Sequence, residues 1–299
     1  MLEITKSSNY MKPVILIKSN NSEVLTSNSL CLIKGEVGSG KSRLVMNIMV
    51  GLSGITEDLN LEYSPCPEGK HVIYLSTEMS PYHLQKRLLK VLSVTGDDYE
   101  NKLKFFDING VTDIKTEVKN ILNKYPPYVI IIDQIGDFVQ DINDVKSCKN
   151  LSMYLNQIIR EYQTSIIVIM HQNEDSGINT KARGHLGSEL EQKSVCSIAI
   201  ANTVKGFKIK TTKMREGINI IMDAEFNQQT EMLKQVIIPS QATVTNSLTF
   251  PLDATSLVQA YMKQYNKSES YVRKIIKDQV SKGILTTSKQ GKEVYYNKQ

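Results

Sequence analysis

The chain has 299 residues, of which 40% are hydrophobic and 22% are charged, a balance typical of soluble globular proteins. No apolar run reaches the length of a membrane span, and the first residues lack the apolar segment of a secretory signal, so we expect a cytoplasmic protein without membrane contact. Its four cysteines are widely spaced and form no C-x-x-C pair, so they are most simply reduced core or surface thiols.

The net charge of +5 is concentrated near the carboxyl end. Residues 251–299 carry nine Lys and Arg against four Asp and Glu, whereas the first 250 residues carry 27 of each sign. Because a basic surface attracts polyanions, this last segment is a candidate DNA-binding module. A solvated basic surface is the alternative.

A glycine-rich segment, GEVGSGKS, follows the short apolar run LCLIK and precedes an apolar helical stretch. Its G-x-x-x-x-G-K-S spacing is that of a loop whose backbone N–H groups cradle the phosphates of a nucleotide. In such a loop Lys41 reaches the β and γ phosphates, and Ser42 offers its hydroxyl to Mg²⁺. A glycine-rich turn without a ligand is the alternative, which the strand-loop-helix context disfavours. The residues assigned to the nucleotide are Gly35, Glu36, Val37, Gly38, Ser39, Gly40, Lys41, Ser42 and Arg43.

Beyond this loop, apolar β-branched runs alternate with helical stretches, which predicts an α/β core with a mostly parallel sheet covered by helices. Strands are expected at 30–34, 71–76, 102–106, 128–133 and 165–170, and helices at 42–52, 81–94, 111–125 and 145–162. Strands at 195–202, 207–213 and 218–225 are expected to extend the sheet in antiparallel fashion. The predicted domains are a P-loop ATPase core over 1–227, a linker over 228–250 and a small module over 251–299.

Two carboxylates stand at the ends of predicted strands. Asp133 ends the run YVIIID, where its side chain would emerge at the carboxyl edge of the sheet and hold the water shell of Mg²⁺. In AAA+ ATPases a catalytic Glu directly follows this Asp, but here Gln134 follows. Glu78, just beyond the run HVIYLS, is therefore the candidate general base for the water that attacks the γ phosphate. The structural alternatives are a strand-ending turn residue for Asp133 and an ordinary carboxylate at a helix start for Glu78.

The run SIIVIM is followed by His171 and Gln172. A polar side chain there can sense the γ phosphate. His171 alone is a weak signal, because an isolated His at a strand end is more often structural. The next segment, NEDSGINTKARGHLG, is polar and rich in glycine, and its cations suit contact with a nucleic-acid backbone. These candidates are Lys181, Arg183 and His185, and a plain solvent loop is the alternative.

Lys213 and Arg215, in TTKMREG, share a face of an extended chain. Both could reach the γ phosphate of a neighbouring subunit and stabilise the charge that develops there, which would make the active unit a homo-oligomer. Surface solvation is the alternative.

The tail restarts as two helices, at 254–264 and 268–281, followed by ILTTS, a KQGK turn and EVYYN. Helix, helix and β-hairpin is the outline of a winged helix. The second helix is amphipathic, and protein contact is the alternative use of this fold. The cations expected to contact DNA lie off its apolar stripe and at the wing: Arg273, Lys274, Lys277, Lys289 and Lys292.

Taken in order, GEVGSGKS, STEMS, YVIIID, VIMHQNE, ARGHLGSELEQK and TKMREG resemble the RecA-like hexameric ATPases of the plasmid RepA and DnaB helicase group, nearest to the RepA-like ATPases of bacterial mobile elements. The resemblance covers roughly residues 13–225. It implies ATP as the nucleotide, DNA as the partner, and a homo-oligomer that can be a hexamer. It also implies that Gln172 senses the γ phosphate, that Arg183 and its neighbours line a central channel, and that Arg215, with Lys213, acts in trans.

Two functions follow from these residues. The first is a DNA-dependent ATPase that separates strands in replication or mobilisation of a genetic element. The second is an ATP-switched DNA-binding regulator without strand separation, because the chain lacks a primase-binding domain of the DnaB kind and a winged helix is not a standard helicase part. A small-molecule enzyme is disfavoured, because no second substrate constellation is found.

Overall fold

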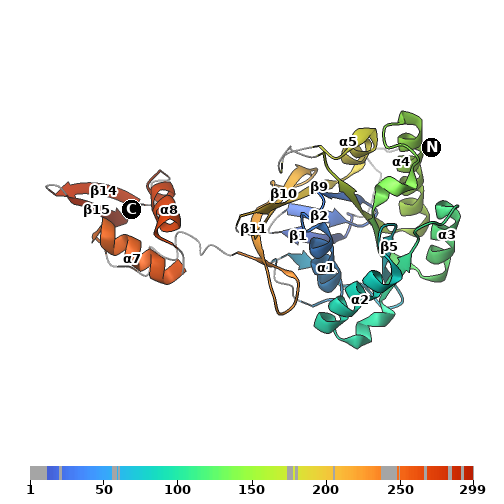
Figure 1. The fold of residues 1–299 in the computed structure, drawn as a ribbon, viewed down its shortest axis with the longest axis horizontal. Coiled ribbons are helices and arrows are strands. Elements are labelled where there is room, and N and C mark those ends of the chain that lie inside the picture. Colours follow the sequence, from blue (N-terminus) through green and yellow to red (C-terminus); the bar gives the residue numbers. More distant parts are fainter. Residues whose placement is uncertain are drawn as a thin grey trace. The chain divides into compact units, whose positions relative to one another are not determined.

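The computed structural model describes residues 12–19, 22–55, 59, 61–173, 178, 181–204, 206–236, 248, 250–265, 268–281, 285–290 and 293–298. The chain divides into two compact units, Met1–Gln235 and Val236–Gln299 (Figure 1). Each unit is considered by itself.

The first unit is built on a nine-stranded sheet in the order β12-β11-β10-β9-β3-β8-β7-β5-β6. The last six of these strands are mutually parallel. They are β9 (Cys196–Thr203), β3 (Leu30–Gly35), β8 (Ser165–His171), β7 (Pro127–Asp133), β5 (His71–Ser76) and β6 (Leu103–Asp107). An antiparallel extension continues from β9 through β10 (Gly206–Met214), β11 (Ile221–Phe226) and β12 (Leu233–Gln235). The predicted α/β class, with a mostly parallel central sheet, is therefore confirmed. This architecture is consistent with the predicted RecA-like P-loop core.

Helices cover both faces of this sheet, which explains why the central strands are apolar throughout. Along β3, Cys31 and Ile33 belong to one hydrophobic core, and Leu30 and Leu32 to the other. The first core includes α1 (Lys41–Leu52) and α2 (Pro81–Thr95); the second includes α3 (Ile114–Lys124), α4 (Val145–Tyr162) and α5 (Gly184–Lys193). Short 3₁₀ helices, η1 (Asp97–Asn101) and η2 (Ile135–Phe138), complete the unit.

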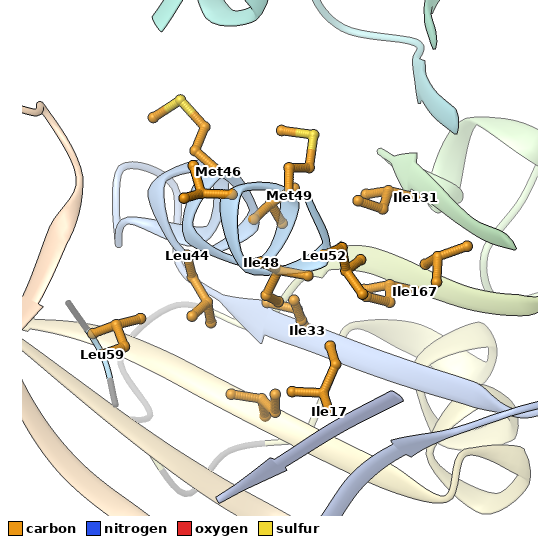
Figure 2. Packing of buried hydrophobic residues seen from close by; sticks show 14 of the residues in the cluster. Ile17, Ile33, Leu44, Met46, Ile48, Met49, Leu52, Leu59, Ile131 and Ile167 are labelled. Carbon is orange, nitrogen blue, oxygen red and sulfur yellow. The ribbon is translucent and has the colours of Figure 1, made fainter. Parts of the chain in front are cut away.

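Helix α1 begins with the last two residues of the phosphate loop, Lys41 and Ser42, so its packing helps to decide where that loop lies. Figure 2 shows Ile48 and Leu52 pointing from α1 toward Ile33 of β3 and Ile167 of β8. These side chains are almost completely buried, and burial of each contributes on the order of 1.5–3 kcal/mol. The loop is thus held between a strand and a helix that are both fixed by the core.

A small antiparallel sheet packs on the first core. It consists of β1 (Ile15–Ser19), β2 (Ser22–Thr26) and β4 (Glu62–Tyr63), in the order β2-β1-β4. Its apolar residues Leu16, Ile17, Val24 and Leu25 are buried. The sequence analysis did not predict this sheet.

Three other details differ from the expectations. Strand β9 is parallel to β3, and the antiparallel extension begins one strand later, at β10. Residues 184–193, which begin inside the predicted loop, form α5 because Leu186 and Leu190 bury their side chains in the second core. Strand β12 pairs with β11, so the first unit continues into the predicted linker as far as Gln235.

The second unit begins with β13 (Leu252–Asp253), which the sequence analysis did not predict. The two helices and two strands that follow are in the predicted order: α7 (Ala254–Tyr265), α8 (Glu269–Ser281), β14 (Leu285–Gln290) and β15 (Glu293–Lys298). Its strands form a sheet in the order β13-β15-β14. A separate core joins Leu257 and Tyr261 of α7 to Val272 and Ile276 of α8. The assignment of this unit as a winged helix stays a prediction. Within the described part of the chain, no helix is long and apolar enough to cross a membrane.

Candidate nucleotide site

The phosphate loop leaves the carboxyl end of β3 at Gly35 and enters α1 at Lys41. Gly40 has a φ of 96°, a conformation that L side chains rarely adopt, and a Cβ at this position would lie 2.7 Å from the ring of Phe207. Asn202, near the end of β9, donates to the carbonyl of Gly38 at 3.0 Å. The glycines are therefore required by backbone shape and by close packing.

Lys41 lies inside the loop with only 7% of its surface exposed. Its Nζ donates to the carbonyls of Gly35 at 2.9 Å and Glu36 at 2.7 Å. Burial lowers the pKa of Lys41, and the carboxylates of Asp133, Glu78 and Glu36 oppose that shift. The hydroxyl of Ser39 is also buried and has no hydrogen-bond partner among the described residues. An ammonium and an unsatisfied hydroxyl within a glycine cradle fit a phosphate chain.

His171, the last residue of β8, joins two charged groups. Its Nδ1 lies 3.2 Å from Nζ of Lys41, and its Nε2 lies 3.3 Å from Oε1 of Glu78. Because Nδ1 faces an ammonium, it accepts, and Nε2 then carries the proton and donates to Glu78. This hydrogen bond lowers the pKa of Glu78, although burial of the carboxyl partly opposes the shift. The predicted general base therefore lies beside the phosphate loop and is ionised at neutral pH.

Asp133 ends β7 and is 7% exposed. Its Oδ2 accepts from the hydroxyl of Tyr74 and from Nη1 of Arg87, the latter at 3.1 Å. Nη1 of Arg87 also donates to the hydroxyl of Tyr74, and its guanidinium lies 5.3 Å from the centre of the tyrosine ring. Burial and the neighbouring Asp133 carboxylate raise the pKa of Tyr74 well above its usual value, so the tyrosine stays protonated and donates.

The residues present fit Mg²⁺ at a nucleotide. The described residues contain no group of three or more His, Cys, Asp and Glu side chains that would hold a metal unaided. Mg²⁺ at phosphate sites needs only one or two protein oxygens, because phosphates and water supply the others. Ser42, in the first turn of α1, and Asp133, at the carboxyl end of β7, are of the right chemistry for this role.

Gln172 and Arg43 occupy different sides of the loop. Gln172 is buried, its backbone N–H donates to the carbonyl of Gly35 at 3.2 Å, and the residue lines a hollow with Glu36 and His171. This position suits the predicted sensor role. The guanidinium of Arg43 lies 4.4 Å from the ring centre of Phe226 and 5.5 Å from that of Phe207.

Lys213 has a partner within its own chain that the sequence analysis did not foresee. Its Nζ donates to the carbonyls of Glu191 at 2.6 Å, Gln192 at 2.9 Å and Ser194 at 2.7 Å, at the carboxyl end of α5. All three donors of the ammonium are thus used to cap a helix. All of these partners lie within the same chain, and the role of Lys213 toward a neighbouring subunit stays a prediction.

Arg215 is exposed and lies at the edge of the sheet opposite to the phosphate loop. The end of β10 pairs with the start of β9, whereas the loop follows the carboxyl end of the parallel strand β3. The backbone of Arg215 donates to the carbonyl of Val195 at 2.8 Å, which fixes it at that edge. Arg215 therefore cannot serve the nucleotide of its own subunit, and a role in trans stays a prediction.

The predicted DNA contacts fall in both units. Lys181, Arg183 and His185 are exposed, and Arg183 also lines hollows beside the phosphate loop. In α8, Lys274 and Lys277 are exposed, while Arg273 forms an ion pair with Glu269 at 2.7 Å. Lys292 and the side chain of Lys289 lie outside the described residues.

Three residues of the site were missed or undervalued: Tyr74, Arg87 and His171. The sequence placed His171 at the right strand end but gave the role to Gln172. Arg87 lies on α2, the helix that follows Glu78, nine residues after Glu78. Its closeness in sequence to the predicted base could have marked it as a candidate site residue. Nothing in an apolar strand marks Tyr74 as a partner of Asp133.

The fold and the loop together define a P-loop nucleoside triphosphatase. A family model of the AAA domain matches residues 17–177, which is more than half of the 299-residue chain. The chain therefore belongs to this AAA domain family, and it is a nucleotide-dependent ATPase. No curated protein matches the chain significantly.

Proposed function

We propose that this ATPase is a DNA-dependent enzyme of the RepA-like helicase class, which acts as a homo-oligomer in replication or mobilisation of a genetic element. The observation that carries the proposal is the line of contacts from Lys41 through His171 to Glu78. It joins the phosphate loop to a carboxylate that follows β5, although β8 and β7 separate β5 from the phosphate-loop strand β3 in the sheet. This is the RecA-type position for the base, rather than position 134, where an AAA+ ATPase carries Glu.

Within one subunit, Lys41 binds the β and γ phosphates of ATP, and Glu78 orients the attacking water and accepts its proton. A carboxylate with a lowered pKa is a weak base, so its main contribution is orientation. This is sufficient for phosphoryl transfer, in which catalysis comes mostly from positioning and charge stabilisation. Mg²⁺, held through Ser42 and Asp133, supplies positive charge to the phosphates when it is bound. Gln172 reports the γ phosphate to the segment that follows it.

Between subunits, Arg215 stabilises the charge that develops on the γ phosphate of a neighbour. Arg215 lies at the edge of the sheet opposite to the phosphate loop of its own subunit, which supports this role. From that position it can contact a nucleotide only when the nucleotide is bound to a neighbouring subunit. A closed ring, such as a hexamer, gives every subunit one such neighbour.

DNA contact is assigned to Lys181 and His185 in the first unit and to a winged helix in the second. The exposed face of α8 carries Lys274 and Lys277, and the opposite face is buried against α7. An amphipathic helix with cations on its free face suits binding to phosphates or to base edges in a groove. Arg273 contributes less, because Glu269 neutralises it.

A strand-displacement assay tests the proposal. Full-length protein, incubated with ATP, Mg²⁺ and a forked DNA duplex, releases the displaced strand. Lys41→Ala is the matched control, because it removes the ammonium that binds the phosphates and leaves the DNA-binding residues unchanged. Displacement that is equal with and without ATP contradicts the helicase assignment.

A second candidate is an ATP-switched DNA-binding regulator that does not separate strands. One observation favours it: Asp137 and Asp141 line the hollow beside Glu78, next to Arg183. Carboxylates at this place repel the phosphates of DNA and weaken the electrostatic attraction between DNA and a channel lined by Arg183. ATP-dependent DNA binding without strand displacement supports this second candidate.

A further inference from the structure

Arg183 lies between two hollows that meet at the nucleotide site. One hollow is lined by Glu36, Val37, His171 and Gln172, and the other by Glu78, Gln134 and His171. Arg183 lines both, and it is the only Arg or Lys among the described lining residues. The residue that was expected in a DNA channel is therefore adjacent to the phosphate loop and to Glu78.

The backbone of Arg183 is fixed at this position. Its N–H donates to the carbonyl of His171 at 3.1 Å, and the preceding residue, Ala182, forms a β-bridge with Gln172. Its carbonyl accepts from the N–H of Gly187 at 3.2 Å. The backbone of Arg183 is thus tied to His171, the residue that contacts both Lys41 and Glu78.

Two glycines make this turn possible. Gly184 has a φ of 71°, and a Cβ there would lie 2.9 Å from the carbonyl oxygen of Ile142. A Cβ on Gly187 would overlap the backbone of Ala182. The segment from Arg183 to Gly187 is therefore the N-cap and first turn of α5, packed closely against its neighbours, rather than a loop free to project from the protein.

The guanidinium has no ion-pair partner within 4 Å in the described part of the chain. It is exposed, in contrast to Arg87, which is paired with Asp133. An exposed guanidinium whose backbone is fixed beside a phosphate cradle is suited to bidentate binding of phosphate oxygens.

We propose that Arg183 binds the γ phosphate of ATP within its own subunit and thereby distinguishes ATP from ADP. The hollows that it lines are on the Glu78 side of the loop, whereas Arg43 lies beside Phe207 and Phe226. The terminal phosphate, which is nearest to the attacking water, is therefore the one within its reach. This inference rests on the nucleotide site and is independent of DNA translocation.

Equilibrium binding of fluorescent ATPγS and fluorescent ADP to the full-length protein tests the proposal. Arg183→Ala is expected to weaken ATPγS binding by about 10- to 100-fold, the usual effect of losing a charge-assisted hydrogen bond, and to change ADP binding by less than about 3-fold. Arg183→Lys keeps the charge and recovers part of the affinity. Lys193→Ala is the matched control, because Lys193 is an exposed cation on α5, the helix that Arg183 precedes, and lines neither hollow; both affinities stay at the wild-type value.

Binding of single-stranded DNA in the absence of nucleotide is measured on the same variants. Under the proposal, Arg183→Ala binds DNA as the wild type does. An Arg183→Ala protein that loses DNA affinity but keeps its preference for ATPγS over ADP overturns the proposal and returns Arg183 to the channel. If the wild-type protein binds ATPγS but DNA does not increase its rate of ATP hydrolysis, the result contradicts the proposed helicase function and leaves the proposal for Arg183 intact.

Discussion

At the scale of single residues, His171 connects the cation and the carboxylate of the site. Its Nε2–H holds Glu78, and this contact keeps the pKa of that carboxyl below its ordinary value. A depressed pKa means that the ionised form of Glu78, and the stability it contributes, are present above the unfolded-state pKa and lost as the pH falls through the folded-state pKa. Glu78 is therefore available to the attacking water at every pH above the ordinary range of a carboxyl group.

Replacing His171 is expected to shift the acidic limit of the enzyme. In His171→Ala, the pKa of Glu78 rises toward its ordinary value, so the acidic limb of the profile of kcat/KM against pH moves to higher pH. His171→Gln keeps a donor near Glu78 and shifts the limb less. An acidic limb that is identical in all three proteins contradicts the role of this hydrogen bond.

Arg87 is the second residue whose role can be measured, because it binds an oxygen of Asp133, the carboxylate that we propose holds the Mg²⁺ water shell. Arg87→Ala removes a competing cation and leaves a buried carboxylate with less charge compensation. We expect the variant to need less Mg²⁺ for half-maximal binding of a fluorescent ATP analogue, and to unfold at a lower temperature when Mg²⁺ and nucleotide are absent.

Lys86→Ala, on the same helix and exposed, controls for general effects of removing a cation from α2. An unchanged Mg²⁺ dependence in Arg87→Ala would show that Arg87 supports the fold without competing for Asp133.

At the scale of elements, α5 links the phosphate strand to the antiparallel extension. Lys34, which directly precedes Gly35, is 2% exposed and pairs with Glu191 of α5. Lys213 of β10 caps the carboxyl end of the same helix. The amino end begins at Arg183. One helix thus carries contacts to the phosphate loop strand, to β10 and to the nucleotide side of the sheet.

Lys213→Ala is expected to lower the free energy of unfolding by about 1 kcal/mol, because the last carbonyls of α5 lose a charged donor. Arg215→Ala, two residues away and exposed, is expected to change it by less than about 0.5 kcal/mol. Denaturant unfolding measures both. Equal stability of Lys213→Ala and the wild type, combined with loss of ATP turnover, would support the trans role of Lys213.

The elements that the sequence predicted well are those decided by local pattern. The runs HVIYLS, YVIIID and SIIVIM became β5, β7 and β8, because β-branched residues buried on both faces leave few alternatives. Helix α5 was missed because its glycines read as a loop, and only the buried surface of the second core reveals why the chain is helical there. The direction of β9 depends on its pairing with β3, which no local pattern encodes.

The same division holds for the site. The loop Gly35–Ser42, Glu78 and Asp133 could be predicted, since each follows a strand whose carboxyl end meets the same edge of the sheet. The partners of these residues could not, because the contacts of Asp133 with Tyr74 and Arg87, or of Lys41 with His171, join segments far apart in sequence. Lys213 looked free for the same reason.

At the scale of the whole molecule, the trans role of Arg215 predicts complementation between inactive subunits. Arg215→Ala retains an intact phosphate loop, and Lys41→Ala retains an intact Arg215. Mixed in equal amounts, the two inactive proteins are expected to recover part of the ATP turnover, because some interfaces join a working loop to a working arginine. No recovery at any ratio contradicts the trans role.

The central claim is that ATP is hydrolysed at the loop joined by His171 to Glu78, and that DNA increases this hydrolysis. The most direct measurement is the steady-state rate of ATP hydrolysis by the full-length protein and by Glu78→Gln, with and without single-stranded DNA, together with ATP binding by both. We expect the wild-type rate to rise with DNA, and Glu78→Gln to bind ATP without hydrolysing it. A wild-type rate that DNA leaves unchanged, or undiminished hydrolysis by Glu78→Gln, would contradict this account.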